Sequence, residues 1–184
     1  MTSRLRPHLH GPVLQEFGTV MQLPIALSPE VRQYSCRRLD RALADTQFLY
    51  LLYKKYQWGM RGPISYQLHL LFDKHAEEQL ELVDALAERV QSLGGVAVGD
   101  LRHAAQITGV PRPPDGIEGV RSMLSRLLDA HKTILADVRD AAARTAELGD
   151  DGTQDLLVSQ SIRTGETQVW FLAEYLVVAP ETGE

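Results

Sequence analysis

The chain has few cysteines, no long hydrophobic run and no excess of positive charge. Its 184 residues include one cysteine, Cys36, so no disulfide can form within the chain, as is usual in a reducing cytoplasm. The longest uninterrupted apolar run, residues 48–53, is far shorter than the ~20 residues that cross a bilayer. Lysine and arginine number 19 against 24 acidic residues, whereas dedicated nucleic-acid binders are usually basic. These absences predict a cytoplasmic protein with no membrane span.

Strand patterns and internal repeats are also missing, and helical periodicity takes their place. Ser28, Pro29 and Glu30 combine a capping hydroxyl, a first-position proline and a first-turn acid, which together predict a helix start. Gly94 and Gly95 are a strong helix stop. The sequence predicts long helices at about residues 28–58, 63–93, 117–148 and 151–178, and a short crossing helix at 100–107.

The connection between the second and third long helices is long, whereas the other connections are short. This spacing favours an all-α, ferritin-like four-helix bundle. We predict an N-terminal tail at residues 1–27, the bundle at 28–178 and a C-terminal tail at 179–184. Asp115 and Glu118 are expected to form a capping box for the third long helix, and Asp151 is expected to cap the fourth.

The second long helix has two faces of opposite character. On a helical wheel its large apolar residues share one side, which we expect to pack into the bundle. The other side carries an acidic stripe, made of His69, Asp73, Glu77, Glu81, Asp84 and Glu88. A solvated face is the simplest interpretation of such a stripe. However, no lysine or arginine is interleaved on it to form the ion pairs of a solvated face, and the histidine favours a metal site.

The spacing within the stripe limits how it could bind a metal. His69/Asp73 and Asp84/Glu88 are pairs of nitrogen and oxygen donors that suit divalent iron, manganese or zinc. The two pairs are separated by about 16 Å along the helix, whereas ligands lie about 2 Å from a metal. If they form one site, a second chain packed antiparallel must supply one pair, and a two-fold dimer forms that site twice. The Glu-x-x-His motif of intrachain di-iron bundles does not occur.

Taken together, these residues resemble the Dps family of miniferritins over about residues 30–178. The segments that carry the resemblance are Lys54-Lys55-Tyr56-Gln57-Trp58, Arg61-Gly62, Leu68-His69, Phe72-Asp73, Asp84, Ala87-Glu88-Arg89, Leu93-Gly94-Gly95, Asp150-Asp151-Gly152-Thr153 and Trp170-Phe171.

The resemblance implies a dodecameric hollow shell that protects against oxidative stress. Such shells oxidise Fe(II) with peroxide or oxygen at sites between two-fold related subunits and store the ferric mineral inside. Carried over by position, His69 and Asp73 come from one subunit and Asp84 and Glu88 from its partner, with Trp58 beside the site. The implied cofactor is iron in a di-iron ferroxidase site, with zinc or another divalent metal as the alternative.

One position departs from the family pattern, which has a histidine immediately before the tryptophan. Here that position is Gln57, whose neutral amide oxygen is a poorer ligand for iron or zinc than imidazole. Three consequences stay open: Gln57 binds weakly, Gln57 holds a water ligand, or the site depends on Asp84 and Glu88 with one metal. Slow oxidation or a changed metal preference would follow.

The remaining titratable residues have weaker assignments. By resemblance, Asp150 and Asp155 line acidic three-fold pores through which iron enters, and Glu77 and Glu81 nucleate mineral on an inner surface. His75 and His131 lie on apolar helix faces and are expected to be buried structural residues. A mobile arm is the favoured interpretation around His8 and His10, and a tail metal site the alternative.

Two other functions compete with iron oxidation. Some members of the family compact DNA through lysine-rich tails, but here residues 1–27 hold only Arg4 and Arg6 against Glu16. The C-terminal tail adds Glu181 and Glu184, so we expect DNA binding to be weak or absent. The third candidate is an assembled shell with a weakened ferroxidase site, which acts as a passive store or structural protein.

Overall fold

The computed structural model describes residues 11–177, and these fold as an all-helical bundle. The helices are α1 (Pro29–Gly59), α2 (Ser65–Ser92), α3 (Leu101–Ile107), α4 (Val120–Glu147), α5 (Asp151–Leu156), the π-helical segment η1 (Leu157–Ile162) and α6 (Arg163–Glu174). No strand occurs among the described residues, which confirms the predicted fold class. Arg4, Arg6, His8 and His10 lie outside the described residues, and so do Val178 and the predicted C-terminal tail.

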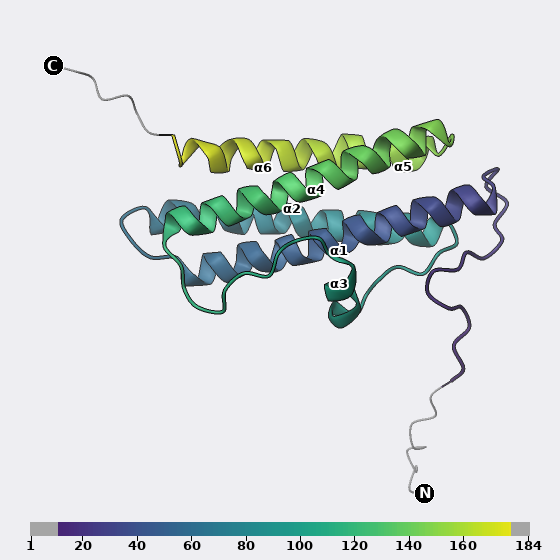
Figure 1. Ribbon diagram of the computed structural model, residues 1–184, viewed down its shortest axis with the longest axis horizontal. Coiled ribbons are helices and arrows are strands. Elements are labelled where there is room, and N and C mark those ends of the chain that lie inside the picture. The colour runs from purple at the N-terminus through teal and green to yellow at the C-terminus, as the bar shows by residue number, and fades with distance from the viewer. Residues whose placement is uncertain (1–10, 178–184) are drawn as a thin grey trace, which may run out of the picture.

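The order and directions of the helices are those of a ferritin-like bundle (Figure 1). α1 and α2 form an antiparallel hairpin, and α5, η1 and α6 follow one another as a fourth long helix beside α4. The connection of residues 93–119, which includes α3, carries the chain back along the length of the bundle. α2 and α4 therefore run in the same direction, as the long crossover predicts.

The helix boundaries at α1 and at the end of α2 follow the sequence signals. Ser28 Oγ accepts the Val31 amide at 3.3 Å, and Pro29 occupies the first turn of α1. Gly94 ends α2 with a φ of 83°, a conformation that favours glycine. A Cβ on Gly94 would lie 2.7 Å from the carbonyl oxygen of Met21, so the chain also needs glycine for this close approach.

Other boundaries were predicted less well. α2 begins at Ser65, two residues after Pro63, and α4 begins at Val120 with Gly119 as a cap that offers no side chain. The predicted capping box is wrong because both acids have other partners. Glu118 pairs with Arg126 at 2.8 Å, and Asp115 pairs with Arg112.

Residues 11–27 form an irregular arm that is anchored to the bundle. The Met21 amide donates to Gly94 O at 2.8 Å, and the buried Arg32 donates from Nη1 to Met21 O at 2.6 Å. Gln15 Nε2 also donates to Gly94 O, at 2.8 Å. These bonds join the arm to the end of α2 and the start of α1.

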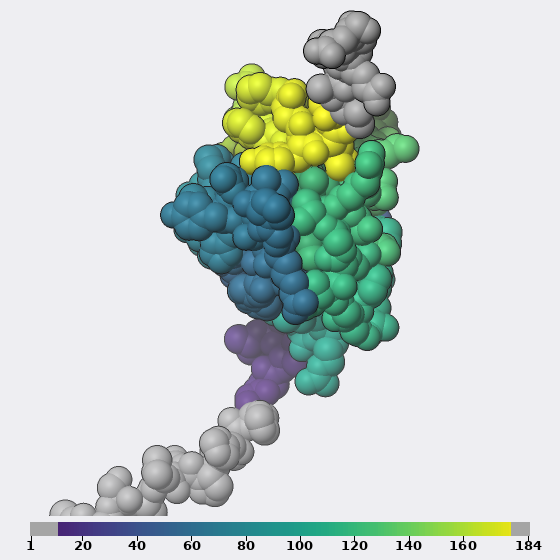
Figure 2. All heavy atoms as spheres, turned by 90° about the vertical axis from the view of Figure 1, so that its left-hand side faces the viewer, coloured from purple at the N-terminus to yellow at the C-terminus, as the bar shows by residue number. Residues whose placement is uncertain are grey.

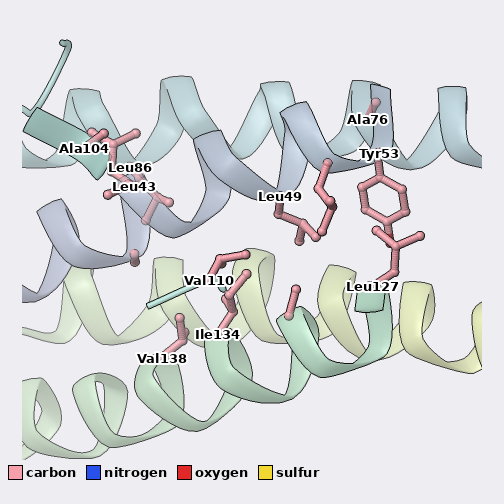
Figure 3. Close-up of a cluster of buried hydrophobic side chains, with 14 of the residues drawn as sticks. Leu43, Leu49, Tyr53, Ala76, Leu86, Ala104, Val110, Leu127, Ile134 and Val138 are labelled. Carbon is pink, nitrogen blue, oxygen red and sulfur yellow. The ribbon is translucent and has the colours of Figure 1, made fainter. Parts of the chain in front are cut away.

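The core lies between the four long helices and is mostly aliphatic. Figure 3 shows side chains from α1, α2 and α4 meeting there, among them Leu43, Leu49, Tyr53, Leu86, Leu127 and Ile134. His75 and His131 are also buried, as the helical wheels predict. Among the described residues, no helix combines the length and the apolar character that a bilayer span needs.

Candidate metal centre on helix α2

Helix α2 separates its two faces as its sequence predicts. Leu68, Phe72, Leu86 and Val90 are buried in the core. The acidic stripe lies on the opposite side, where five of its members are exposed and Asp73 is half-buried. The stripe therefore faces away from the bundle of its own chain, and any metal site built on it opens to solvent or to another chain.

The first ligand pair lies near the α1–α2 connection, at the end of the bundle that Figure 2 shows in blue. His69 Nδ1 is 3.4 Å from the backbone oxygen of Gln57, so the end of α1 lies against the imidazole. The Gln57 side chain is only 5 % exposed, whereas Trp58 is 73 % exposed. Gln57, Trp58 and His69 line one shallow surface pocket together with Tyr66.

The stripe is not free of cations, because α1 supplies one. Lys54 Nζ lies 2.7 Å from Asp73 Oδ1. Hydrogen bonds from Lys54 and then from Gln57 hold the pKa of Asp73 below its usual value. Asp73 is thus anionic and already paired, and a metal ion that binds it has to displace the ammonium group. Sequence reasoning missed Lys54 because the contact joins two helices.

The second pair has no such partner. Asp84 and Glu88 are both exposed, and within residues 11–177 no hydrogen bond or ion pair engages either carboxylate. No three histidine, cysteine, aspartate or glutamate side chains gather into a metal-sized group anywhere in that part of the chain. The two pairs on α2 therefore do not converge within one chain.

An apolar surface lies beside the first pair. Leu51 and Trp58 are exposed on α1, and they line a pocket with Phe48, Val110 and Pro111. The crossover of residues 93–119 thus supplies one wall and α1 the other. A contiguous apolar surface next to polar groups is typical of a protein–protein contact.

The structure corrects the assignment of Asp150. Its carboxylate is buried and accepts hydrogen bonds from Ser35 at 2.6 Å, from the Thr153 amide at 3.1 Å and from Thr153 Oγ1 at 2.7 Å. Arg89 Nη2 pairs with it at 2.6 Å. Asp150 therefore caps α5, the role predicted for Asp151, and it does not line an open pore.

The other acidic residues of this segment stay accessible. Asp151 lies in the first turn of α5 and is exposed, so it offsets the helix dipole without capping the helix. Asp155 is also exposed, one turn further along. The expected pore role therefore rests on Asp155.

Comparison with known proteins places the chain among ferritin-like proteins. A model of the ferritin-like domain matches residues 36–181. An uncharacterized protein of Kitasatospora aureofaciens is 79 % identical over 82 % of this chain and 100 % of its own length. A nutrient stress-induced DNA-binding protein of Synechococcus is 32 % identical over 92 % of this chain and 95 % of its own.

Solved structures of Dps proteins are also similar to this chain. The structure named DpsC from Streptomyces coelicolor shares 65 % identity with this chain and superposes with a TM-score of 0.91. The match covers 94 % of this chain and 100 % of that one. Dps from Thermosynechococcus elongatus shares 31 % identity with a TM-score of 0.78, over 84 % of this chain and 98 % of its own. A Dps protein from Vibrio cholerae, described as one of the ferritin-like diiron-carboxylate proteins, shares 28 % identity with a TM-score of 0.79 over 89 % of this chain and 99 % of its own.

Proposed function

The chain belongs to the Dps family of ferritin-like proteins, and from this premise we propose that it oxidises Fe(II) with peroxide or oxygen and stores the ferric product. The oxidation takes place between two-fold related subunits of a dodecameric shell. Iron is the substrate and the cargo of this reaction.

The outward placement of two ligand pairs on one helix carries this proposal. Both pairs lie on the face of α2 that its own bundle leaves uncovered, and no third ligand joins either pair within the described residues. An antiparallel copy of α2 brings Asp84 and Glu88 of one chain to His69 and Asp73 of the other, because a two-fold axis exchanges the two ends. The apolar surface beside Trp58 is the contact that such a copy covers.

Each residue of the site has a distinct role in this scheme. Asp84 and Glu88 supply two carboxylates that accept no hydrogen bond from residues 11–177, so they take up Fe(II) without losing a partner there. His69 supplies an imidazole nitrogen, and its Nδ1 contact with Gln57 O orients the ring. The Lys54 ammonium keeps the Asp73 carboxylate ionised while the site is empty of substrate. When iron binds, Asp73 exchanges this ammonium for the metal ion.

Gln57 weakens one of the two iron positions. Its amide is a neutral donor, and it helps to hold the pKa of the neighbouring Asp73 below its usual value. We therefore propose that Asp84 and Glu88 hold the first iron, and that the position near Gln57 and Asp73 fills less readily. Oxidation is slower than at a site with an additional imidazole.

Storage uses the rest of the acidic surface. Glu77 and Glu81 lie on the exposed stripe outside the two ligand pairs and are assigned to mineral nucleation. Asp155 is assigned to the entry pore, where symmetry copies of an exposed carboxylate attract cations.

Stopped-flow oxidation of Fe(II) by peroxide, with the mass of the assembly measured in parallel, tests the proposed function. Asp84→Ala is expected to lower the initial rate, whereas Glu147→Gln removes an exposed charge from α4 and is expected to leave that rate unchanged. Equal rates for Asp84→Ala and wild type would contradict the site, and a monomeric mass would contradict the intersubunit arrangement. Slow oxidation at the same rate in all three proteins would favour the passive store.

DNA binding is the second candidate function, favoured by the name of the Synechococcus relative. The described arm opposes it, because residues 11–27 contain no lysine or arginine. We propose that DNA binding by this chain is weak or absent.

A further inference from the structure

A buried tyrosine lies between two buried histidines in the centre of the bundle. Tyr53 of α1 has its hydroxyl oxygen 2.7 Å from Nε2 of His131 on α4 and 3.2 Å from Nδ1 of His75 on α2. Tyr53 is fully buried, and each histidine is 1 % exposed. Figure 3 shows the Tyr53 ring reaching from α1 across the core toward Leu127 of α4.

The protonation states of Tyr53 and His131 follow from their burial. Desolvation lowers the pKa of His131 to about 3, and it raises the pKa of Tyr53. At neutral pH the phenol of Tyr53 and the imidazole of His131 are therefore both neutral.

The hydrogen bonds in the cluster have a direction. The shorter contact assigns the phenol proton to His131 Nε2, so that Tyr53 donates to an imidazole with a free lone pair. His75 Nδ1–H then donates to the same hydroxyl oxygen, and its bare Nε2 is left buried without a partner.

The cluster adjoins the candidate iron site. Tyr53 immediately precedes Lys54, which binds Asp73, and its ring packs edge-on against Phe72 with the centroids 5.8 Å apart. Phe72 in turn immediately precedes Asp73. Two routes thus connect the phenol to Asp73. One is a backbone link followed by the hydrogen bond of Lys54, and the other is the ring contact with Phe72 followed by a backbone link.

We propose that Tyr53 is a one-electron donor to the oxidant at the iron site, and that His131 Nε2 receives its proton. This inference rests on the proposed function, because peroxide bound with Fe(II) is the oxidant. Oxidation of a phenol releases its proton, and a neutral imidazole at 2.7 Å is placed to take that proton without solvent.

The step balances with one iron and one tyrosine. Peroxide needs two electrons to break its O–O bond, and one Fe(II) gives only one as it becomes Fe(III). Tyr53 gives the second electron, its O–H bond breaks, and an N–H bond forms at His131. With two protons from solvent the products are two water molecules, Fe(III), a neutral tyrosyl radical and an imidazolium. A site weakened at Gln57 often holds a single iron, and this relay completes the two-electron reduction there.

The proposal is tested by mixing the assembled, metal-free protein with one Fe(II) per site and hydrogen peroxide, freezing the sample within seconds, and recording the electron paramagnetic resonance spectrum. We expect the spectrum of an organic radical. Its hyperfine splitting is expected to narrow when the protein is produced with ring-deuterated tyrosine. Tyr53→Phe is expected to lose the signal. Tyr56→Phe is the matched control, because it deletes another buried hydroxyl of α1 that bonds the carboxylate of Glu118 instead of an imidazole.

His131→Gln provides a second variant with the phenol intact. It removes the base, and we expect radical formation to slow roughly 100-fold. Radical formation at the wild-type rate in this variant would overturn the assigned acceptor. A signal that survives in Tyr53→Phe, or that ring deuteration does not change, would overturn the relay.

The Fe(III) absorbance of the same samples separates the two proposals. Iron oxidation without a tyrosyl radical would overturn the relay alone, and the proposed function would stand. The absence of iron oxidation in wild-type protein would overturn the proposed function and the relay with it. Thermal unfolding of each variant confirms that its fold is retained.

Discussion

At the scale of single residues, we expect Gln57 to set how strongly the proposed site binds a second iron. The Gln57→His variant replaces a neutral amide with imidazole beside Asp73 and His69. We expect tighter Fe(II) binding and oxidation that is faster by about tenfold, the size of effect that a changed donor near a metal produces. Anaerobic calorimetry and stopped-flow absorbance measure the two quantities. If Gln57→His and Gln57→Ala both behave as wild type, Gln57 lies outside the site.

We expect Lys54 to compete with a metal ion for Asp73. The two side chains lie 2.7 Å apart and are 21 % and 42 % exposed, so the ion pair itself contributes little to stability. We expect Lys54→Met to tighten Zn²⁺ binding, measured by calorimetry, because the cation no longer has to displace an ammonium group. The neighbouring Lys55→Met is the control, since Lys55 donates to the backbone oxygen of Asp115 instead. Equal affinities in the two variants would contradict the competition.

Single residues also show which contacts could be predicted from the sequence and which could not. The i, i+4 pairs on α2 could be found because helical geometry fixes them within one segment. Lys54 and the Tyr53 cluster could not, because their partners lie on other helices, and only the packing of α1 against α2 and α4 defines which residues meet. His75 and His131 were correctly predicted to be buried, but their shared contact with Tyr53 was not.

At the scale of elements, Asp150 joins the start of α5 to α1 and α2. Asp150→Asn removes a buried charge that Arg89, Ser35 and Thr153 satisfy, and we expect a loss of about 2–4 kcal/mol in the free energy of unfolding. Asp151→Asn, at the exposed neighbouring position, is expected to change it little. Thermal and denaturant unfolding measure both, and equal stability of the two variants would contradict the assigned cap.

The pH dependence of that loss follows from the pKa of Asp150. Burial opposes ionisation, but hydrogen bonds from Ser35 and Thr153 and the charge of Arg89 outweigh it, and the pKa falls below its usual value of 3.8. The stabilisation is therefore complete above pH 3.8 and is lost as the pH falls through the lower folded value. The difference between Asp150→Asn and wild type is expected to shrink in that acidic range only.

Asp40 joins α1 to the crossover, and its pKa is shifted in the opposite direction to that of Asp150. Its buried carboxylate accepts the Val98 amide at 2.9 Å, and burial raises its pKa from 3.8 to about 6. Folding is therefore favoured by Asp40 below pH 4 and opposed as the pH rises through 6. We expect Asp40→Asn, which keeps an oxygen for Val98, to raise the unfolding free energy by about 1–2 kcal/mol at pH 7.5. Unfolding at pH 4 should show no such gain, and a loss of stability at pH 7.5 would contradict the prediction.

The helices themselves were predictable because their signals are local. The cap at Ser28 and the glycine stop at Gly94 fixed both ends of the α1–α2 hairpin to within about two residues. The π-helical segment η1 was not predicted from the sequence, which indicated one continuous fourth helix. In α6, a Cβ on Gly165 would lie 3.0 Å from Leu135, so the glycine permits a close approach to α4.

At the scale of the whole molecule, the intersubunit site was inferred from one helix, and the fold is consistent with that inference. The bundle buries one face of α2 and leaves the acidic stripe uncovered, so both proposed ligand pairs face away from their own chain. In the proposed dimer, the separation of the two pairs along α2 sets the overlap that a partner chain must have. Sequence alone could not place the apolar surface between α1 and the crossover, because Leu51 and Pro111 are distant in the chain.

DNA binding is also decided at this scale, because affinity for phosphates rises with the number of cationic contacts on the assembled surface. Residues 1–27 contribute two arginines and one glutamate to each subunit, and the chain carries a net charge of −5. We expect no gel shift of duplex DNA by the intact assembly at physiological salt. A variant with lysines added at Ser3, Gln15 and Gln22 is the positive control, because it supplies the missing charges and should bind with a steep salt dependence. Tight binding by wild-type protein at physiological salt would contradict the prediction and would favour the activity named for its Synechococcus relative.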